Sequence, residues 1–403
     1  MVRFVSASEA AALLRGGMTV GIGGFGAYAC PDGLLTALAQ RFHESGEPRG
    51  LTLVTGITPG PSRKSSQGLA LLKEPGLIDT MITGHLANAP EIAAMVGADE
   101  IAGYALPLGV VMHLFRAIAG KKPGVLTHVG LGTYADPRQE GCRANQRARM
   151  QGREIVSLIQ TGEQEAFLYH AFPLDACLIR ATYADEDGSL SLAHEALTDA
   201  QLEMAAAVHN QGGIVIVQVE EIVQRGSLPP RSVRVHHSLV DYVVKAASPQ
   251  LHLQSYASPY YRPDLTGDVR CLTSNAPPMP LDLRKVIARR GAMELKRDAL
   301  INLGIGIPSG VASVANEEGL ASHTTLSLES GPVGGVPLEG MGFAAAMNPE
   351  TIYNIADTFD LYDGGHGLSG CGRNRQERKR KRIQIWRPVY RPRGIHQHFP
   401  EHT

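Results

Sequence analysis

The strongest constraint on the fold of this chain is an alternation of short β-branched runs with stretches of helical periodicity. MTVGIGG precedes PDGLLTALAQRF, LTLVTG follows, and further along GGIVIVQVEEIV precedes HSLVDYVVKAA, which we expect to be helical. Strands buried on both faces have continuous apolar sequences, and parallel strands need helical crossovers between them. The pattern therefore predicts an α/β protein of open, mostly parallel sheets covered by helices.

A proline-rich segment divides the chain. CLTSNAPPMPLDL has little periodicity and is followed by RKVIARRGAMEL, which is typical of a helix. We expect an N-terminal domain over residues 1–271, a linker over 272–284, and the start of a second domain over 285–372. In both domains a strand leads through glycines to a proline and an apolar helix, from Thr19 to Pro31 and from Leu300 to Pro308. The recurrence suggests two related domains.

Composition excludes several classes of protein. Of the 403 residues, 43% are hydrophobic and 19% charged, which is ordinary for a chain that buries more than one core. No apolar run is long enough to cross a bilayer, and the first residues lack the pattern of a secretion signal, so we expect a cytoplasmic protein. The cysteines are scattered, with no metal-ligand spacing, and we expect them reduced: Cys30, Cys142, Cys177, Cys271 and Cys371.

Gly21, Gly23 and Gly26 satisfy the G-x-G-x-x-G pattern, so a dinucleotide site has to be considered. A nucleotide-binding fold of that type also has an acidic residue at the end of its second strand, which holds the ribose. Here LTLV ends in Thr55 and Gly56 instead. The pattern alone is weak, and a turn without a ligand is the better interpretation.

The segment with most chemical content is TTLSLESGPVGGVP, in which an alternating strand leads directly to Glu329. An isolated glutamate at a strand end is usually a solvated side chain. Here Gly331, Gly334 and Gly335 remove bulk around the carboxylate, and Pro332 restricts the turn. The pattern indicates an acid that a large ligand can approach.

ESGPVGGVP is similar to the catalytic signature of family I coenzyme A transferases. Other segments resemble that family in the same order, among them GGFGAYACPDGLL, THVGLGTYADPRQ, TYADEDGSLSLAHEA and FDLYDGGH, and together they cover nearly all of residues 1–366. The resemblance is to the large single-chain acetate or acetoacetyl type. It implies two related open-sheet domains of the CoA-transferase type, of which the second is incomplete here.

For function, the resemblance implies that Glu329 is the nucleophile that carries CoA between acyl groups. CoA is then both substrate and covalent intermediate, with no further cofactor and no metal. Acyl-CoA and short-chain carboxylates are the expected partners of a homo-oligomer, with neither nucleic acid nor membrane. The glycine-rich turns are the expected lining of the CoA and acyl site: Gly23, Gly24, Phe25, Gly304, Gly306, Gly331, Gly334 and Gly335.

Two positions depart from the family pattern. The family has a glutamine that helps to form the oxyanion hole, and Leu108 stands at that position, so either a backbone N–H replaces it or the rate falls about 10²- to 10³-fold. Ala29 stands where members carry glycine.

Residues 373–403 differ in character from the rest. They contain ten arginines and lysines and two glutamates, a net charge of +8 against −9 for residues 1–372. If residues 373–386 are written in plausible codons and read one base later, the translated sequence is similar to the one that follows this point in members of the family. We therefore expect an out-of-frame tail, and a product that is poorly soluble and nearly inactive because its second sheet is unfinished.

Two other functions stay open from the residues alone. A non-catalytic protein on the same scaffold would bind acyl-CoA or a sugar phosphate without turnover. The basic tail would alternatively bind nucleic acid, in a manner that depends on salt concentration.

Overall fold

The computed structural model describes residues 1–272, 278–295, 297, 299–304, 306, 308–320, 323–364, 368–369 and 384–385. Most of the basic tail and part of the expected linker, including residues 273–277, lie outside these ranges. Within them no helix is long and apolar enough to cross a membrane.

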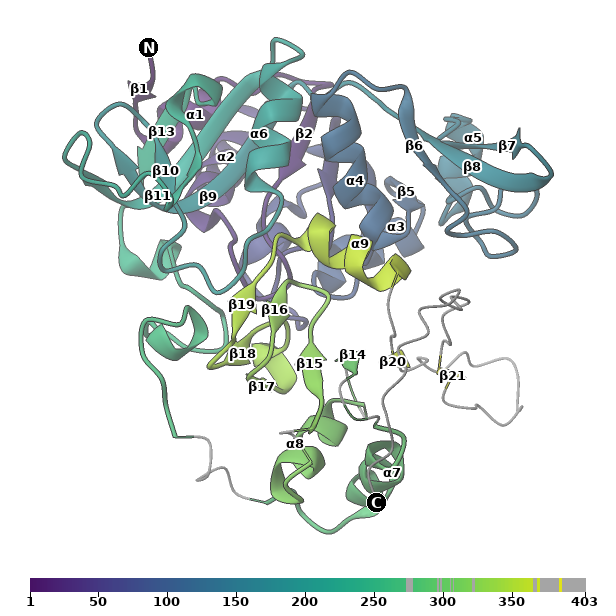
Figure 1. The fold of residues 1–403 in the computed structure, drawn as a ribbon. Coiled ribbons are helices and arrows are strands. Elements are labelled where there is room, and N and C mark those ends of the chain that lie inside the picture. The colour runs from purple at the N-terminus through teal and green to yellow at the C-terminus, as the bar shows by residue number, and fades with distance from the viewer. Residues whose placement is uncertain are drawn as a thin grey trace, which may run out of the picture.

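A large sheet forms the body of the molecule (Figure 1). Its strands run in the order β1-β13-β11-β9-β2-β3-β4-β5, and every pair along this path is parallel. The bounds in that order are Arg3–Phe4, Tyr242–Lys245, Ile214–Val223, Ala176–Asp185, Thr19–Ile22, Leu51–Thr55, Ile78–Thr83 and Ala102–Ala105. The short strands β10 (Leu190–Ser191) and β12 (Val233–Val235) extend it by antiparallel pairing. The predicted α/β class with a mostly parallel sheet is confirmed.

Helices cover both faces of this sheet. They are α1 (Ala7–Ala12), α2 (Asp32–Ser45), α3 (Pro90–Gly97), α4 (Leu108–Ala119) and α6 (Gln201–His209). Neighbouring strand residues belong to different cores: Leu53 packs with α1, α2 and α3, whereas Val54 packs with α4 and α6. Successive side chains of a strand point to opposite faces, so the sheet is buried on both sides.

A smaller antiparallel sheet stands beside α4. Its order is β6-β8-β7, with bounds Gly124–Thr127, Gln164–His170 and Val156–Thr161, and α5 (Gln146–Gln151) lies nearby. Short 3-10 helices connect several elements: Gly68–Leu72, His237–Leu239, Pro249–Leu251, Pro263–Leu265 and Gly340–Gly342.

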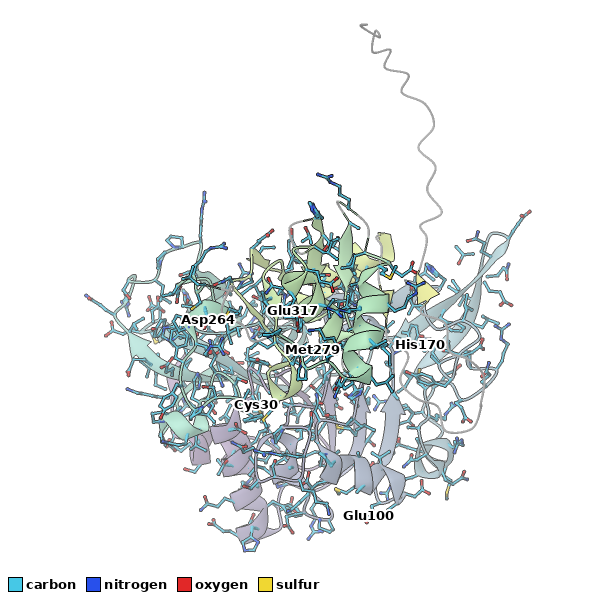
Figure 2. The ribbon with its side chains drawn as sticks, turned by 90° about the horizontal axis from the view of Figure 1, so that it is seen from below. Cys30, Glu100, His170, Asp264, Met279 and Glu317 are labelled. Atoms are coloured by element: carbon cyan, nitrogen blue, oxygen red, sulfur yellow. The ribbon has the colours of Figure 1, made fainter. Side chains whose placement is uncertain are left out.

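The chain after residue 278 forms a second α/β part, which Figure 2 shows lying over the middle of the first. Its sheet runs β14-β15-β16-β19, with bounds Leu300–Asn302, Thr325–Ser327, Pro332–Val333 and Thr351–Ile352. Further elements are α7 (Leu283–Ala292), α8 (Ser309–Glu317), β17 (Val336–Pro337), β18 (Ala346–Met347), α9 (Ile355–Gly364), β20 (Leu368–Ser369) and β21 (Gln384–Ile385). Lys285 ties α7 to α8 by donating to Glu317 at 2.6 Å and to the Met279 carbonyl at 2.7 Å.

One predicted helix is wrong. HSLVDYVVKAA forms a 3-10 turn at His237–Leu239 and then strand β13, which pairs with β1 and β11. Val243 and Val244 are β-branched and fully or nearly fully buried. Such residues fit a strand between two neighbours better than a helix.

Candidate active site around Glu329

Glu329 lies in the turn directly after β15, where it is partly buried. Burial raises the pKa of its carboxyl above the usual value, and within the described residues no hydrogen bond or ion pair opposes that effect. Tyr362 of α9 stands nearby and donates its hydroxyl to Ser327 Oγ at 3.1 Å. A carboxylate that is poorly solvated and unpaired is a stronger nucleophile than one in water.

The glycines after Glu329 allow the chain to pack against itself. Gly331 has φ +120°, and a Cβ there would lie 2.2 Å from the Tyr353 carbonyl oxygen. Gly335 has φ +72°, and its Cβ would lie 2.3 Å from the Met347 carbonyl oxygen. Gly334 also has positive φ, at +74°. These positions need glycine for the turn itself, whether or not a ligand also approaches them.

The first predicted turn, at Gly23-Gly24-Phe25, is closed by the protein. The Gly24 N–H donates to Asp199 Oδ2 at 2.7 Å, and a Cβ on Gly24 would lie 2.9 Å from Pro59. Phe25 is 2% exposed. Asp199 is buried as well, and burial raises the pKa of its carboxyl. In this conformation an acyl group reaches Phe25 only if the turn moves.

The second predicted turn is more open. Gly306 has φ +97°, and a Cβ there would meet no atom of the described residues within 4 Å. The Ser309 hydroxyl donates to the Gly306 carbonyl at 2.7 Å at the start of α8. Gly304 is partly buried, and Ile305 lies outside the described residues. Gly306 therefore leaves room for a ligand, which Gly24 does not.

Leu108 is the first residue of α4 and borders a cavity of about 580 Å³. The Leu108 backbone packs tightly on the end of β4, since a Cβ on Gly84 would lie 2.9 Å from its Cα. The cavity runs between α4, β6 and α9, with cationic and apolar walls: Pro107, Leu108, Gly109, Val110, His113, Arg116, Ala117, Lys122, Gly124, Val125, Leu126, Thr127, Val129, Phe359 and Asp360. Of the predicted site residues, only Leu108 lines it among the described residues.

Contacts between α4, α6 and α9 hold the two parts of the chain together, and no sequence motif indicated them. Arg116 donates to Glu203 at 3.0 and 3.1 Å and to Asp357 at 2.7 Å. Asn354 donates to Glu203 at 3.0 Å and to the Asp199 carbonyl at 3.2 Å. Asp357 lies two residues before FDLYDGGH, and within that motif Asp360 contacts Arg116 at 3.7 Å, but the motif did not indicate this partner.

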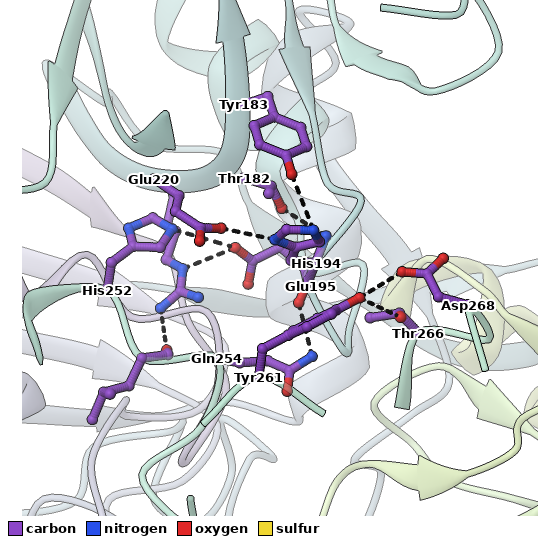
Figure 3. A network of polar contacts seen from close by, with 12 residues as sticks. Thr182, Tyr183, His194, Glu195, Glu220, His252, Gln254, Tyr261, Thr266 and Asp268 are labelled. Carbon is purple, nitrogen blue, oxygen red and sulfur yellow. Dashed lines mark hydrogen bonds and ion pairs between the residues drawn. The ribbon is translucent and has the colours of Figure 1, made fainter. Parts of the chain in front are cut away.

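A buried polar network supports the body beside the first turn (Figure 3). Arg180 of β9 donates to Glu195 Oε1 at 2.9 Å and also to the Leu253 carbonyl, and both charged side chains are at most 2% exposed. His252 lies 3.9 Å from Glu195, and burial lowers the pKa of its imidazole well below the usual value. Nearer the surface, His194 contacts Glu220 at 2.8 Å and Tyr183 at 3.0 Å. The network fixes the segment that follows Leu251.

Four of the five cysteines lie within the described residues. Cys30, Cys142 and Cys177 are free and buried, and Cys271 is free and exposed. Cys371 lies outside the described residues. In those residues, no group of three or more histidines, cysteines or acids could hold a metal ion.

Comparison with known proteins decides the family. Residues 4–246 match the family model described as coenzyme A transferase. The chain belongs to the coenzyme A transferase family. It is 40% identical over 365 residues to a caffeate CoA-transferase of Acetobacterium woodii, covering 91% of this chain and 68% of that protein. It is 34% identical over 338 residues to the acetate CoA-transferase YdiF of Escherichia coli K12, covering 84% and 62%.

A solved structure agrees with this family. The YdiF acyl-CoA transferase of E. coli O157:H7 superposes with a TM-score of 0.83 as apoenzyme and 0.82 as a thioester complex with CoA. Each alignment has 32% sequence identity and covers 90% of this chain and 67% of that one. The chain thus spans about two thirds of the length of these relatives, which are enzymes of the CoA-transferase class.

Proposed function

We propose that this protein transfers CoA from an acyl-CoA to a free carboxylic acid through a thioester on Glu329. The observation that carries the proposal is the desolvated Glu329 carboxylate just after β15, to which the described residues offer no hydrogen bond or ion pair. A similar structure from the same family is a thioester complex with CoA. Family membership by itself would not single out this glutamate.

In the proposed reaction the Glu329 carboxylate attacks the thioester carbonyl. The C–S bond breaks, leaving an acyl-glutamyl anhydride and CoA thiolate. The thiolate then attacks the glutamyl carbonyl, which releases the first acid as its carboxylate and forms glutamyl-CoA. An acceptor carboxylate reverses both steps. The thioester bond energy is retained, so the reaction needs neither ATP nor a metal.

The surroundings of Glu329 support this chemistry in two ways. Exclusion of water protects the anhydride from hydrolysis and strengthens electrostatic interactions with the tetrahedral oxyanions. The long nucleotide arm of CoA supplies binding energy remote from the reacting atoms. Leu108 offers no side-chain donor to an oxyanion, so the proposal leaves that stabilisation to backbone N–H groups alone, at a lower rate than an added side-chain donor would give.

The relatives are named for acetate and caffeate, and we propose short-chain acids as the first class of acceptor, with caffeate as the comparison. A cytoplasmic homo-oligomer that binds neither nucleic acid nor membrane also belongs to the proposal.

The test incubates the full chain with acetyl-CoA and analyses the digest by mass, because a single adduct can form even on the nearly inactive product that the sequence predicts. We expect a CoA adduct on the peptide that contains Glu329, and its loss when acetate or caffeate is added. Glu329→Gln should abolish the adduct, whereas Glu339→Gln, an exposed glutamate in the same part of the chain, should retain it. Binding of acetyl-CoA without any adduct would favour the non-catalytic alternative.

A further inference from the structure

Residues 340–345 of the second part form a loop whose end is buried in the core of the first part. Ala344 and Ala345 are 1% and 0% exposed, and they belong to the same hydrophobic cluster as Phe25, Ala27 and Tyr28. We call residues 340–345 the inserted loop. It joins the turn that follows Glu329 to the turn that follows β2, although the two are about three hundred residues apart in the sequence.

Two buried hydroxyl groups, one from each part of the chain, donate to backbone carbonyls of the inserted loop. Tyr28, which is 1% exposed, donates its hydroxyl to the Gly342 carbonyl at 2.7 Å. Ser330, which is fully buried and follows Glu329 directly, donates its hydroxyl to the Ala344 carbonyl. The two bonds form a continuous connection from Tyr28 in the first part to the backbone next to Glu329.

The loop is held in a conformation that costs free energy. Ala344 has φ +93°, a region that residues with a Cβ rarely adopt. Such strain persists only where surrounding contacts determine the backbone, and here these include the bond from Ser330 and the burial of Ala345. A strained segment beside a reactive group is a reason to look for a positioning role.

We propose that Tyr28 is a positioning residue for Glu329, acting through the Gly342 carbonyl, the inserted loop and Ser330. The inference rests on the proposed function, because it assigns a purpose to the placement of the Glu329 carboxylate. Neither the glycine-rich signature around Tyr28 nor the signature around Glu329 indicates this connection.

The physical argument concerns the placement of a reacting atom. Burial raises the pKa of Tyr28 to about 12, so at neutral pH its hydroxyl keeps the proton that it donates. Without that donor, the buried Gly342 carbonyl keeps only a long bond from the Ala345 N–H, at 3.4 Å, and the loop relaxes to recover a better one. A displacement of about 1 Å at a nucleophile lowers the rate about 10²-fold even when the ligand still binds.

The test is Tyr28→Phe, which removes one hydroxyl and keeps the ring. We expect the rate of CoA adduct formation on Glu329 at saturating acetyl-CoA to fall about 10- to 100-fold, with less than a twofold change in the dissociation constant for CoA. The matched control is Tyr104→Phe: this tyrosine is also 1% exposed and donates to the Ala148 carbonyl at 3.1 Å, within the first part only. It should leave the adduct rate unchanged.

A second variant separates positioning from loss of fold. Ser330→Ala breaks the other bond to the same loop, so the double variant with Tyr28→Phe should lose less rate than the product of the two single losses. Fully multiplicative losses would overturn the connection. So would an adduct rate equal to wild type in Tyr28→Phe, or a fall equal to that of Tyr104→Phe. An absent adduct in the wild type would instead overturn the proposed function, and this inference with it.

Discussion

The burial of the Glu329 carboxylate lowers the stability of the fold while this acid is charged. Its pKa is raised because burial disfavours the charged form, so the folded protein holds the proton more tightly than the unfolded chain does. Above the folded-state pKa the charge costs stability. Below the unfolded-state value, near 4.5, that cost is absent.

We therefore expect Glu329→Gln to unfold at a higher temperature than wild type at pH 8, with the difference disappearing as the pH falls below about 4. Thermal unfolding followed by circular dichroism at both pH values measures it. Glu339→Gln serves as the control because that side chain is exposed. A glutamine variant that is less stable at pH 8 would contradict the desolvated state of this acid.

The raised pKa of Glu329 also predicts how the rate of the proposed reaction changes at acidic pH. Only the carboxylate attacks the thioester, so adduct formation should decline as the pH approaches the raised pKa, at a higher pH than an ordinary glutamate would give. Adduct yields after short, fixed times between pH 4 and 8 would show it. A rate that stays constant down to about pH 4.5 would be inconsistent with the raised pKa.

Ala29 occupies a position suited to glycine. It has φ +54° and is 2% exposed, a backbone conformation that favours the glycine expected there from the family resemblance. Ala29→Gly should stabilise the protein by about 0.5–1 kcal/mol, since relief of the left-handed strain exceeds the entropy that glycine adds to the unfolded chain. Urea unfolding at pH 7 measures the change, and a loss of stability would show that the methyl packing matters more.

Leu108 offers a gain-of-function prediction. A glutamine there would add a side-chain donor at the position that the family resemblance implies for the oxyanion hole. Leu108→Gln should raise the adduct rate about 10- to 100-fold, with little change in stability because the side chain is only partly buried. An unchanged rate would mean that backbone N–H groups already stabilise the oxyanion as well as a side-chain donor could.

At the scale of elements, the crossing of α9 over α4 and α6 fixes how the two parts meet. Arg116 links all three helices, and the Glu203 side chain that it contacts is only 9% exposed. Phe359 packs directly on Gly109, where a Cβ would lie 2.7 Å from the ring. Phe359 and Asp360 of α9 form part of the wall of the cavity beside Leu108.

Replacing Arg116 by methionine should therefore cost about 1–3 kcal/mol of stability, because Glu203 keeps its charge without its main partner. Arg225→Met is the matched control: Arg225 contacts Asp187 at 2.8 Å, but its side chain is 67% exposed, so that loss should be below about 0.5 kcal/mol. Chemical denaturation compares the two variants, and equal losses would show that the α4–α9 crossing does not depend on this cluster.

At the scale of the whole molecule, the hydrophobic cores do not follow the expected boundary between domains. Ala344, Ala345, Ile355 and Ala356 belong to a core of the first part. A separate, smaller core joins α7, α8, β14 and β15: Ala288, Ala292, Ile301, Leu303, Val311, Ala312, Val314 and Leu326. Different segments of the second part are therefore stabilised by two different cores.

Hydrogen exchange should reveal this division. Buried amides of residues 344–356 should exchange about as slowly as those of β9 and β11, because they open only with the large core. Amides of α7 and α8 should exchange at least 10-fold faster, since their core is small and Leu283, Val286 and Met293 are exposed. Mass spectrometry of exchanged peptides measures both groups, and uniform protection over residues 283–356 would contradict separate cores.

The sequence by itself was sufficient for features that depend on neighbouring residues. The alternation of strands and helices predicted the parallel sheet, and PDGLLTALAQRF and RKVIARRGAMEL form α2 and α7. The signature around Glu329 placed that acid after a strand, as observed. Strand and turn patterns of this kind repeat over a few residues, so one segment contains the information.

Only the tertiary structure decided which distant segments meet. Strand β13 forms because β1 and β11 flank it, and its own pattern resembles a helix. Backbone atoms of the chain itself lie where a Cβ of Gly331 or Gly335 would be. The Tyr28 hydroxyl of the first part donates to the Gly342 carbonyl of the second. Contacts between residues hundreds of positions apart depend on topology and packing, and a pattern that extends over one turn or one strand contains no record of them.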